Sequence, residues 1–473
     1  MRPTLAVVGS LTLAATTSLP AQRLADRVAA VREGTVTFRY AARPEVCGDG
    51  PTIIIRELGP GTGFAIYSPD GLTIGDSWNG RPPVCVHGPA HVRLAVRNRA
   101  VVAVRPFMGE TGGMFGATDL GSVNSAEAAA YFLQLARTAT EEMCYTAMIA
   151  AAIADSARIS APLLAIAQDR SLRPANREQA LKWLARTAPR EGNTAAEASV
   201  RAIAADQTDV PDVRERAIRV LTHPTSDAFL RDLYGRLTPA LKERVIRVVA
   251  ESDTPENLAW IARVAENEAE AVDLRDRAIR VLGEELHQTD RLRALYPRLA
   301  TTDLKDRVIR VVAADADAGA IRWLRTLAVT ATEPLEARDR ALRVLGEQGE
   351  VEYLREVYAR LDRQDLQERV LRELGERGGS ENTRFLRGVA LDPQSHVDLR
   401  DRSLRMLAEA GLRSADLAAL YDTIAVADLR ARLINLLAER GDDAARDKLD
   451  DIARRDPDPD LRNRAAKRLA EAH

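Results

Sequence analysis

A twelve-residue phrase constrains the fold of this chain more than any other feature. It reads Asp-Leu-Arg-Asp-Arg-Ala-Ile-Arg-Val-Leu-Gly-Glu at 273–284 and returns, with small changes, about every thirty residues. Intervals between copies alternate between 28–30 and 32–33 residues, so the deeper period is a double unit of about 62. Such a period predicts a solenoid, in which each helical unit buries its apolar face against its neighbours. The central Arg of the copies is Arg216, Arg244, Arg277, Arg307, Arg340, Arg369, Arg402, Arg432 and Arg464.

Each copy has the pattern of an amphipathic helix. When its first residue is numbered place zero, apolar residues fall at places one, five, six, eight and nine, which form one stripe at about 100° per residue. We expect the Asp at place zero to cap the helix, because its carboxylate can accept hydrogen bonds from unpaired amides of the first turn. These residues are Asp212, Asp273, Asp303, Asp365, Asp398, Asp428 and Asp460.

The central Arg at place four is expected at the seam between successive units. Its stem would cover apolar surface, and its guanidinium would meet an acid or a carbonyl of the next unit. We therefore interpret the nine arginines as a structural ladder. A row of Arg facing an anionic ligand is the alternative, and the acids close to each Arg in the sequence disfavour it.

Places three, seven and eleven lie opposite the apolar stripe. An acid at place three followed by Arg at place seven is a favourable i,i+4 pair on an exposed helix face. Because these places are not needed for the core, they are candidates for binding a partner. The candidate partner-binding residues are Asp276, Arg280, Glu284, Arg310, Asp339, Arg343 and Arg372.

Aromatic residues in the first helix of each unit repeat with the double period. One class of unit carries Tyr and the other carries Trp or Phe, at intervals of 62 or 63 residues. We interpret them as core packing, with peptide binding as the alternative. The residues are Tyr234, Tyr296, Tyr358 and Tyr421 in one class and Trp260, Trp323 and Phe385 in the other.

Residues 1–21 have the layout of a cleavable secretory signal. An early Arg precedes an apolar stretch from Leu5 to Ala15, and Leu-Pro-Ala precedes Gln22. The stretch is too short for a convincing membrane span, and no later segment approaches the roughly 20 apolar residues that a membrane helix needs. We therefore expect an exported protein, periplasmic or extracellular, with no integral membrane segment in the mature chain.

The region 22–120 predicts a small β-rich domain with a leading helix at 22–34. Its β-branched runs are separated by Gly, Pro and Asn, and the last two flank Arg97-Asn98-Arg99 as in a hairpin. The glycine-rich stretch 108–125 is expected to be a flexible junction. In an oxidising compartment Cys47 and Cys85 would pair, whereas Cys144 has the apolar context of a buried free thiol.

No catalytic or cofactor constellation stands out in the sequence. The six His never recur at the repeat period, Cys85, His87 and His91 do not have a zinc-ligand spacing, and the Gly-rich stretch 59–63 reads as a tight turn. The net charge of −2 gives no basic footprint for nucleic acid. We therefore expect a protein that is not an enzyme and needs no cofactor or metal.

The repeated phrase resembles that of HEAT repeats, especially the short HEAT-like type of phycobilisome lyases, as in bacterial exported HEAT-repeat proteins. The resemblance covers 125–473, about eleven helical pairs. It implies an α-solenoid whose second helices line the concave side and serve as a binding platform for a macromolecule. Some HEAT-like proteins are chromophore lyases and others are DNA glycosylases. A glycosylase would need a basic concave face and a cytoplasmic address, and a lyase would be expected to offer a distinct acid or nucleophile outside the repeat pattern, so both are disfavoured here.

These patterns predict an exported scaffold or adaptor that binds a protein or peptide on the concave face of the solenoid. In the alternative, the β-rich domain binds a small ligand or envelope polymer, and the repeats act as spacer or transmitter. Asp76, Trp78, His87 and His91 motivate this alternative, because they lie in the one non-repetitive region. A purely mechanical spacer is the third possibility.

Overall fold

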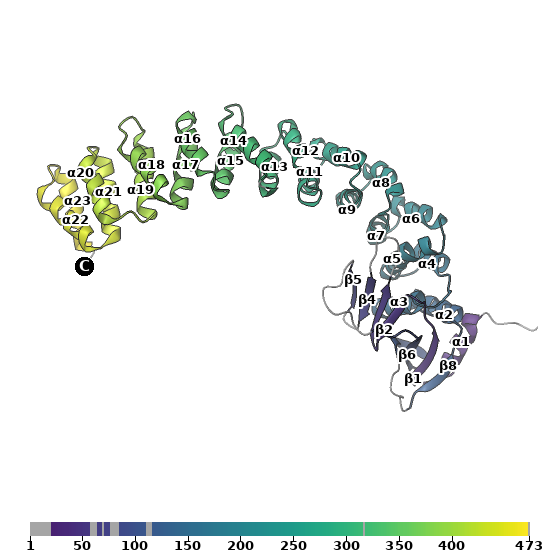
Figure 1. Cartoon of the computed structure of the whole chain (residues 1–473). Helices are drawn as coiled ribbons and strands as arrows, with labels where there is room; N and C mark the ends of the chain where they lie inside the picture. The colour runs from purple at the N-terminus through teal and green to yellow at the C-terminus, as the bar shows by residue number, and fades with distance from the viewer. Residues whose placement is uncertain are drawn as a thin grey trace, which may run out of the picture. The chain divides into compact units, whose positions relative to one another are not determined.

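The structure is a computed structural model that describes residues 20–56, 64–68, 71–75, 85–109, 116–315 and 317–471. It confirms the predicted fold class, a solenoid of paired helices preceded by a small β-rich region (Figure 1). Contacts divide the chain into two compact units, Met1–Ser252 (unit 1) and Asp253–His473 (unit 2). The β-rich region therefore belongs to the same unit as the first helical pairs.

Two four-stranded sheets form the β-rich region of unit 1. One has the strand order β7-β6-β1-β8 and the other β2-β3-β4-β5. The strands of the first are β1 (Gly34–Ala41), β6 (Pro89–Arg97), β7 (Ala100–Met108) and β8 (Thr118–Ser122). Those of the second are β2 (Val46–Asp49), β3 (Thr52–Arg56), β4 (Phe64–Ser68) and β5 (Gly71–Gly75).

Two strands of the first sheet have one buried face and one more accessible face. Buried and more accessible residues alternate along β1 and β6, so one face packs on the helices while the other carries polar side chains. The predicted hairpin is confirmed: Asn98 and Arg99 both have positive φ, as a tight two-residue turn between β6 and β7 requires.

The expectation of a flexible junction over 108–125 is wrong at β8. This strand pairs in parallel with β1, and its sequence Thr-Asp-Leu-Gly-Ser lacks the alternation that marks a strand. Its backbone partners lie about eighty residues away in the chain. No pattern of neighbouring residues in the sequence therefore indicates this strand.

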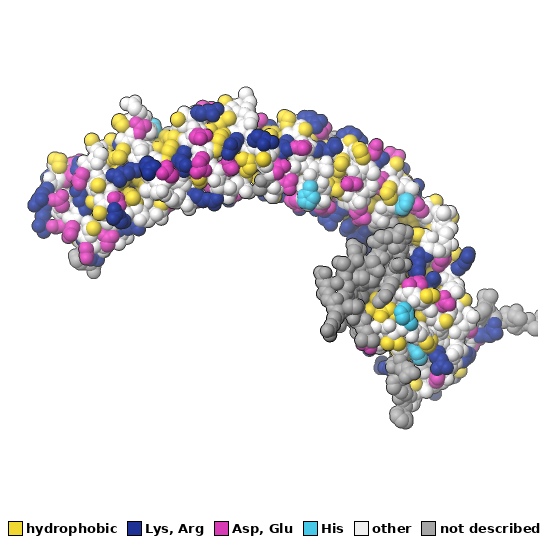
Figure 2. All heavy atoms as spheres, viewed as in Figure 1, with side chains coloured by type: hydrophobic (Ala, Val, Ile, Leu, Met, Phe, Trp, Pro, Cys, Tyr) yellow, Lys and Arg dark blue, Asp and Glu magenta, His cyan; other side chains and the backbone are white. Residues whose placement is uncertain are grey.

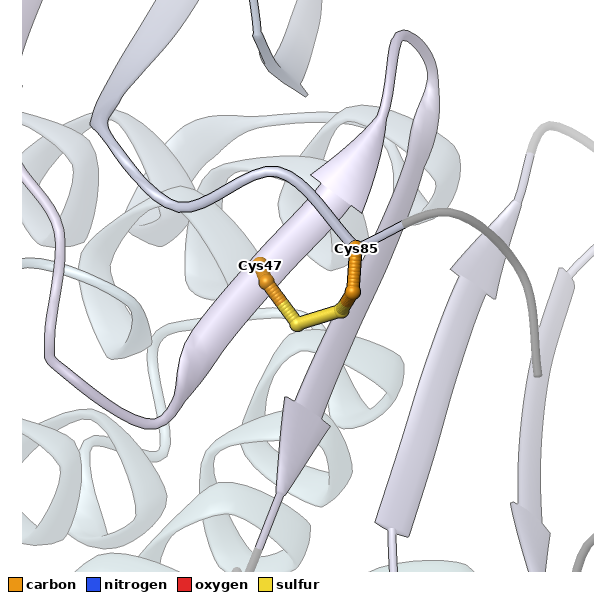
Figure 3. The surroundings of a disulfide bond; sticks show 2 residues. All are labelled: Cys47 and Cys85. Carbon is orange, nitrogen blue, oxygen red and sulfur yellow. A yellow bond between two sulfur atoms is a disulfide. The ribbon is translucent and has the colours of Figure 1, made fainter.

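A disulfide ties the two ends of the second-sheet region together. Figure 3 shows Cys47, on β2, bonded to Cys85, which precedes the segment that leads into β6. Backbone hydrogen bonds between Gly48 and Val86 hold the same two segments side by side. Cys144 is buried and free, and burial raises the pKa of its thiol to about 12.

Helices fill the rest of unit 1. The leading helix α1 (Pro20–Ala29) packs on α2, and four pairs follow in the described residues. They are α2 (Ser125–Thr138) with α3 (Glu141–Ala152), α4 (Ser160–Gln168) with α5 (Pro174–Arg190), α6 (Ala195–Ala205) with α7 (Pro211–Arg219), and α8 (Asp227–Tyr234) with α9 (Pro239–Ala250), a 3-10 turn η1 (Pro224–Ser226) preceding α8. Residues 1–19 of the predicted signal segment lie outside the described residues.

Unit 2 continues the pairs. Figure 1 shows the first helices from α10 to α18 along one edge and the second helices from α11 to α19 along the other, and consecutive second helices pack on one another throughout the unit. The first helices are α10 (Pro255–Glu266), α12 (Thr289–Leu295), α14 (Ala318–Val329), α16 (Val351–Val357), α18 (Ser380–Leu391), α20 (Ser414–Thr423) and α22 (Asp443–Arg455). The second helices are α11 (Val272–Arg280), α13 (Thr302–Asp315), α15 (Leu335–Glu347), α17 (Gln364–Arg377), α19 (Val397–Glu409), α21 (Ala427–Arg440) and α23 (Pro459–Glu471). Short turns η2 (Val281–Glu285, π-helical), η3 (Tyr296–Arg298) and η4 (Tyr358–Arg360) extend α11, α12 and α16.

The second helices bury the predicted apolar stripe. In α11 and η2, residues at places one, five, six, eight and nine are all buried, from Leu274 to Leu282. The capping role expected of the Asp at place zero is wrong, because the helix begins one residue earlier, as at Val272 before Asp273. The Asp is thus the second helical residue. There its negative charge still interacts favourably with the helix dipole.

Candidate functional site

The central arginines link successive second helices through the acid at place three. Arg307 Nε lies 2.5 Å from Asp276 Oδ1, and Arg340 Nε lies 2.7 Å from Asp306 Oδ1. The same link joins Arg216 to Glu178, Arg244 to Glu215, Arg369 to Asp339 and Arg432 to Asp401. Arg277 pairs with Glu285 of its own repeat, while Arg402 and Arg464 make no ion pair with a described residue.

The acid belongs to the preceding repeat, not to the next one as expected. At about 100° per residue, places four and three lie on opposite flanks of the helix, about 40° and 300° from place zero. The Arg flank therefore faces the repeat before it, and the acid flank faces the repeat after it. Place three is a seam position, and the Asp276 side chain is only 21% exposed.

Each of several seam acids joins two arginines. Asp306 accepts from Arg310 of its own helix at 2.8 Å and from Arg340 of the following helix. Asp276 does the same with Arg280 and Arg307. One carboxylate thus faces two guanidiniums. Each group of one seam acid and two arginines therefore has a net charge of about +1.

Removing a seam Arg should cost more than removing its exposed neighbour. Arg307→Ala deletes a contact between repeats at a side chain that is 27% exposed. We expect it to lower the free energy of unfolding by about 1–2 kcal/mol. Arg310→Ala, at a side chain 48% exposed, should cost less than about 0.5 kcal/mol. Urea titrations of both variants provide the measurement, and the reverse order would refute the assignment of faces.

The candidate partner-binding residues divide into two groups in the structure. Asp276 and Asp339 belong to the seam, so they are not freely available to a partner. Arg280, Arg310 and Arg343 keep 36%, 48% and 49% of their side chains exposed. The remaining candidates are Glu284, which is exposed, and Arg372, which is half-buried.

The aromatic residues of the first helices pack between repeats. Tyr296 meets Trp323 edge-on with 5.2 Å between ring centroids, and Tyr358 meets Phe385 in the same way at 5.4 Å. The Tyr side chains are buried. The interpretation as core packing is confirmed for Tyr296 and Tyr358, whereas Trp323 and Phe385 remain half-buried.

A second set of arginines, at place two, is buried in the structure and was not predicted from the sequence. Arg275 is 3% exposed, and its Nε donates to the Ala265 carbonyl at 2.9 Å. The same bond forms in five repeats, and in all five the carbonyl belongs to the last residue but one of the first helix. Backbone carbonyls at that end of a helix lack a partner within the helix. The other pairs are Arg177 with Ala167, Arg214 with Ala204, Arg338 with Ala328, and Arg400 with Ala390.

Place two also explains why the period is double. In three of the four alternate units it holds a cation over the Tyr ring, as where Lys305 Nζ lies 4.9 Å from the Tyr296 ring centroid and the Arg430 guanidinium lies 4.4 Å from that of Tyr421. In the fourth unit place two is Gln367, whose Nε2 donates to the Tyr358 carbonyl at 3.3 Å. The recurrence of Arg every 61–63 residues in Arg214, Arg275, Arg338 and Arg400 was the available signal.

Glu373 is an acid at place eight, which is apolar in the neighbouring copies. Its side chain is 7% exposed, and Arg369 Nη1 lies 3.5 Å from its Oε1. Burial, and secondarily the charge of Glu376, raises the pKa of Glu373 to about 7 despite the nearby guanidinium. The folded protein therefore binds this proton more tightly than the unfolded chain does.

We expect Glu373 to make the protein less stable as the pH rises. Its contribution is fully present below the pKa of the unfolded chain, about 4.3, and is lost as the pH rises to about 7. Glu373→Gln should therefore raise the free energy of unfolding by about 1–3 kcal/mol at pH 8 and change little near pH 4. Urea titrations from pH 4 to 8 test this, with the exposed Glu381→Gln as control. If the free energies of unfolding of the wild type and of Glu373→Gln changed with pH in parallel, the predicted role of Glu373 would be contradicted.

A cleft of about 680 Å³ opens in the β-rich region of unit 1. Its wall is formed by residues 39–44 and Val46, by residues 87–89 at the start of β6, and by residues 122–125 between β8 and α2; Glu45 pairs with Arg190 and is not part of the wall. Its polar side chains are Arg39, Arg43, His87, Ser122, Asn124 and Ser125. Of the four residues that motivated ligand binding by this region, His87 lines the cleft. His91 stacks on Phe107 at 5.3 Å, and Asp76 and Trp78 lie outside the described residues.

The described residues contain neither a candidate metal site nor a candidate membrane span. No three His, Cys, Asp or Glu side chains among them are grouped so that they could hold a metal ion. No helix among them combines the length and the apolar character needed to cross a membrane.

Comparisons with known proteins assign no family to the chain. No family model and no curated protein matches it. Importin beta aligns at 10% identity over 73% of this chain and 60% of its own, with a TM-score of 0.31. Human deoxyhypusine hydroxylase aligns at 15% identity over 59% and 98%, with a TM-score of 0.22. The AP-3 complex aligns at 11% over 73% and 76%, with a TM-score of 0.29. The chain thus spans less than two thirds of the importin chain, and at these TM-scores none of the likenesses carries an inference about function.

Proposed function

We propose that this protein is an exported, non-enzymatic scaffold that binds a protein or extended peptide on the concave face of its solenoid. The observation that carries the proposal is the row of half-exposed arginines at place seven in unit 2. Arg280, Arg310 and Arg343 stand on successive second helices that pack on one another. The same position on each repeat offers the same chemical group to a partner.

The charge of this row is only partly balanced within the protein. Each seam acid that pairs with a place-seven Arg also pairs with the central Arg of the next repeat, as at Asp276 and Asp306. Glu284 and Glu347 flank the row at place eleven, so the surface is a set of mixed stripes. Figure 2 shows basic and acidic side chains interspersed over the visible face of unit 2.

The geometry favours an extended partner with regularly spaced acids. Packed helices lie about 8–10 Å apart, and an extended chain rises about 3.3 Å per residue. Acidic side chains at about every third residue of the partner would therefore meet successive arginines. Affinity would come from many modest contacts and specificity from the charge pattern.

The exported location is part of the proposal. The signal-like segment 1–21 supports it, and so does the disulfide between Cys47 and Cys85, because disulfides persist in oxidising compartments.

Cross-linking and mass spectrometry on intact cells should identify the partner. Charge reversal by Arg310→Glu with Arg343→Glu should then reduce its capture at least tenfold. Arg322→Glu, an exposed position on the first helix α14, is the matched control and should leave capture unchanged. Equal capture of the partner by the wild type and the double variant would overturn the scaffold function. So would the absence of any cross-linked partner together with turnover of an ester, glycan or peptide by the purified protein.

A further inference from the structure

The cleft of unit 1 differs from the helical repeats in its electrostatics. Its wall contains Arg39, Arg43 and His87 and no carboxylate. In the repeats, by contrast, most arginines at the seams face an acid. The chain as a whole carries a net charge of −2, so this positive lining is a local feature of the β-rich region.

Both arginines of the cleft are held by neutral acceptors. Arg43 donates from Nε to the Ala152 carbonyl at 3.0 Å and from Nη2 to the Ala157 carbonyl at 2.8 Å. Arg39 Nε donates to Ser122 Oγ at 3.0 Å. These bonds orient the guanidiniums without neutralising them. Nη1 of Arg43 and both Nη atoms of Arg39 make no hydrogen bond with a described residue, so they remain available to a ligand.

The polar face of the first sheet extends the positive charge beyond the cleft. Arg93 on β6 lies directly opposite Arg105 on β7, and neither forms an ion pair with a described residue. Arg39 lies on the same face in the adjacent row, opposite His91. Like charges directly opposite each other in a sheet are unfavourable. A bound anion next to this face would relieve the repulsion.

We propose that the cleft binds a small molecule through a carboxylate or phosphate group. A volume of about 680 Å³ is within the range of small-ligand sites. Guanidinium groups recognise both oxyanions through paired N–H···O bonds, which are stronger than bonds between neutral groups. Arg39 and Arg43 bind the oxyanion, and Ser125 and Asn124 at the start of α2 also line the cleft. The proposal is independent of the scaffold function, which rests on unit 2.

Calorimetric titration of the full chain at low salt tests the proposal. The probes are inorganic phosphate, glycerol phosphate, succinate and citrate, with sodium chloride of equal ionic strength as the blank. We expect saturable binding of at least one probe. Binding of phosphates alone or of carboxylates alone identifies the oxyanion, and either result supports the site.

Variants separate this site from general surface charge. Arg39→Gln removes an exposed side chain and should keep the fold, while weakening binding about tenfold. Arg43→Gln should weaken it at least as much, with circular dichroism confirming that the protein is folded. Arg97→Gln, at the opposite end of β6, is the control and should change affinity less than twofold. Absence of saturable binding for all four probes, or equal affinity in wild type and Arg39→Gln, would overturn the proposal.

Discussion

Replacing Arg177 by Met is expected to lower the free energy of unfolding by about 3–5 kcal/mol, because it breaks a buried ion pair from one side. Arg177 is 2% exposed, and its Nη1 and Nη2 lie 2.7 and 2.5 Å from the two carboxylate oxygens of Asp209. Its Nε also satisfies the Ala167 carbonyl at 2.9 Å. Met fills a similar volume but leaves the Ala167 carbonyl and Asp209 Oδ2 without the Arg177 donor, while Asp209 Oδ1 keeps only the bond from the Val210 N–H at 2.8 Å.

Two further variants make this result interpretable. The hydrogen bonds from Arg177 are the largest cause that holds the pKa of Asp209 below its usual value. The double variant Arg177→Met with Asp209→Asn removes the stranded charge and should recover part of the loss. Arg384→Met breaks an exposed pair whose Arg is 73% exposed, and it should cost less than about 0.5 kcal/mol. Equal unfolding midpoints for Arg177→Met and Arg384→Met in urea would contradict the buried-pair account.

The second large effect is expected at Gly283, where two second helices approach closely. A Cβ there would lie 1.9 Å from Val311 Cγ1 and 2.8 Å from Leu292 Cδ1. Gly283 is at place ten and Val311 at place eight of the next second helix. The same two places bring Gly375 next to Met406. At both positions a Cβ at place ten would meet the side chain at place eight of the following repeat.

Gly283→Ala should therefore destabilise the protein by about 2–3 kcal/mol through overpacking. Gly388→Ala, in the helix Ser380–Leu391, has open space around its Cβ and should stabilise by about 0.5–1 kcal/mol. Adding Val311→Ala to Gly283→Ala should restore much of the loss, which double-mutant analysis of unfolding would detect. A stabilising effect of Gly283→Ala would refute the close packing of these helices.

The surface left for a partner is smaller than the sequence predicted. Places three and seven are both charged, and periodicity alone puts them on the same side of the helix. Packing separates them, because the flank that carries Asp276 lies against Arg307 of the following repeat. Arg280 and Arg310 remain accessible, and any binding function of the second helices depends on such residues.

The arginines at place two show how far a residue-type argument can mislead. At about 100° per residue, place two lies near 200° from place zero, in the middle of the apolar arc. An Arg at that angle must be buried, whereas the stripe expected from apolar residues alone, at places one, five, six, eight and nine, leaves place two out. Its recurrence at the double period, in Arg275 and Arg338, could have revealed it.

The sequence by itself determined the period, the helical pairs and the buried stripe of each second helix, because these depend on the local geometry of one helix and on repetition. Only the tertiary structure decided which neighbour the central Arg reaches and that β8 pairs with β1. It alone brought residues 39–44, 87–89 and 122–125 together around one cleft. The reason is physical: these features depend on the relative placement of elements distant in the chain, and no local pattern of residues records that placement.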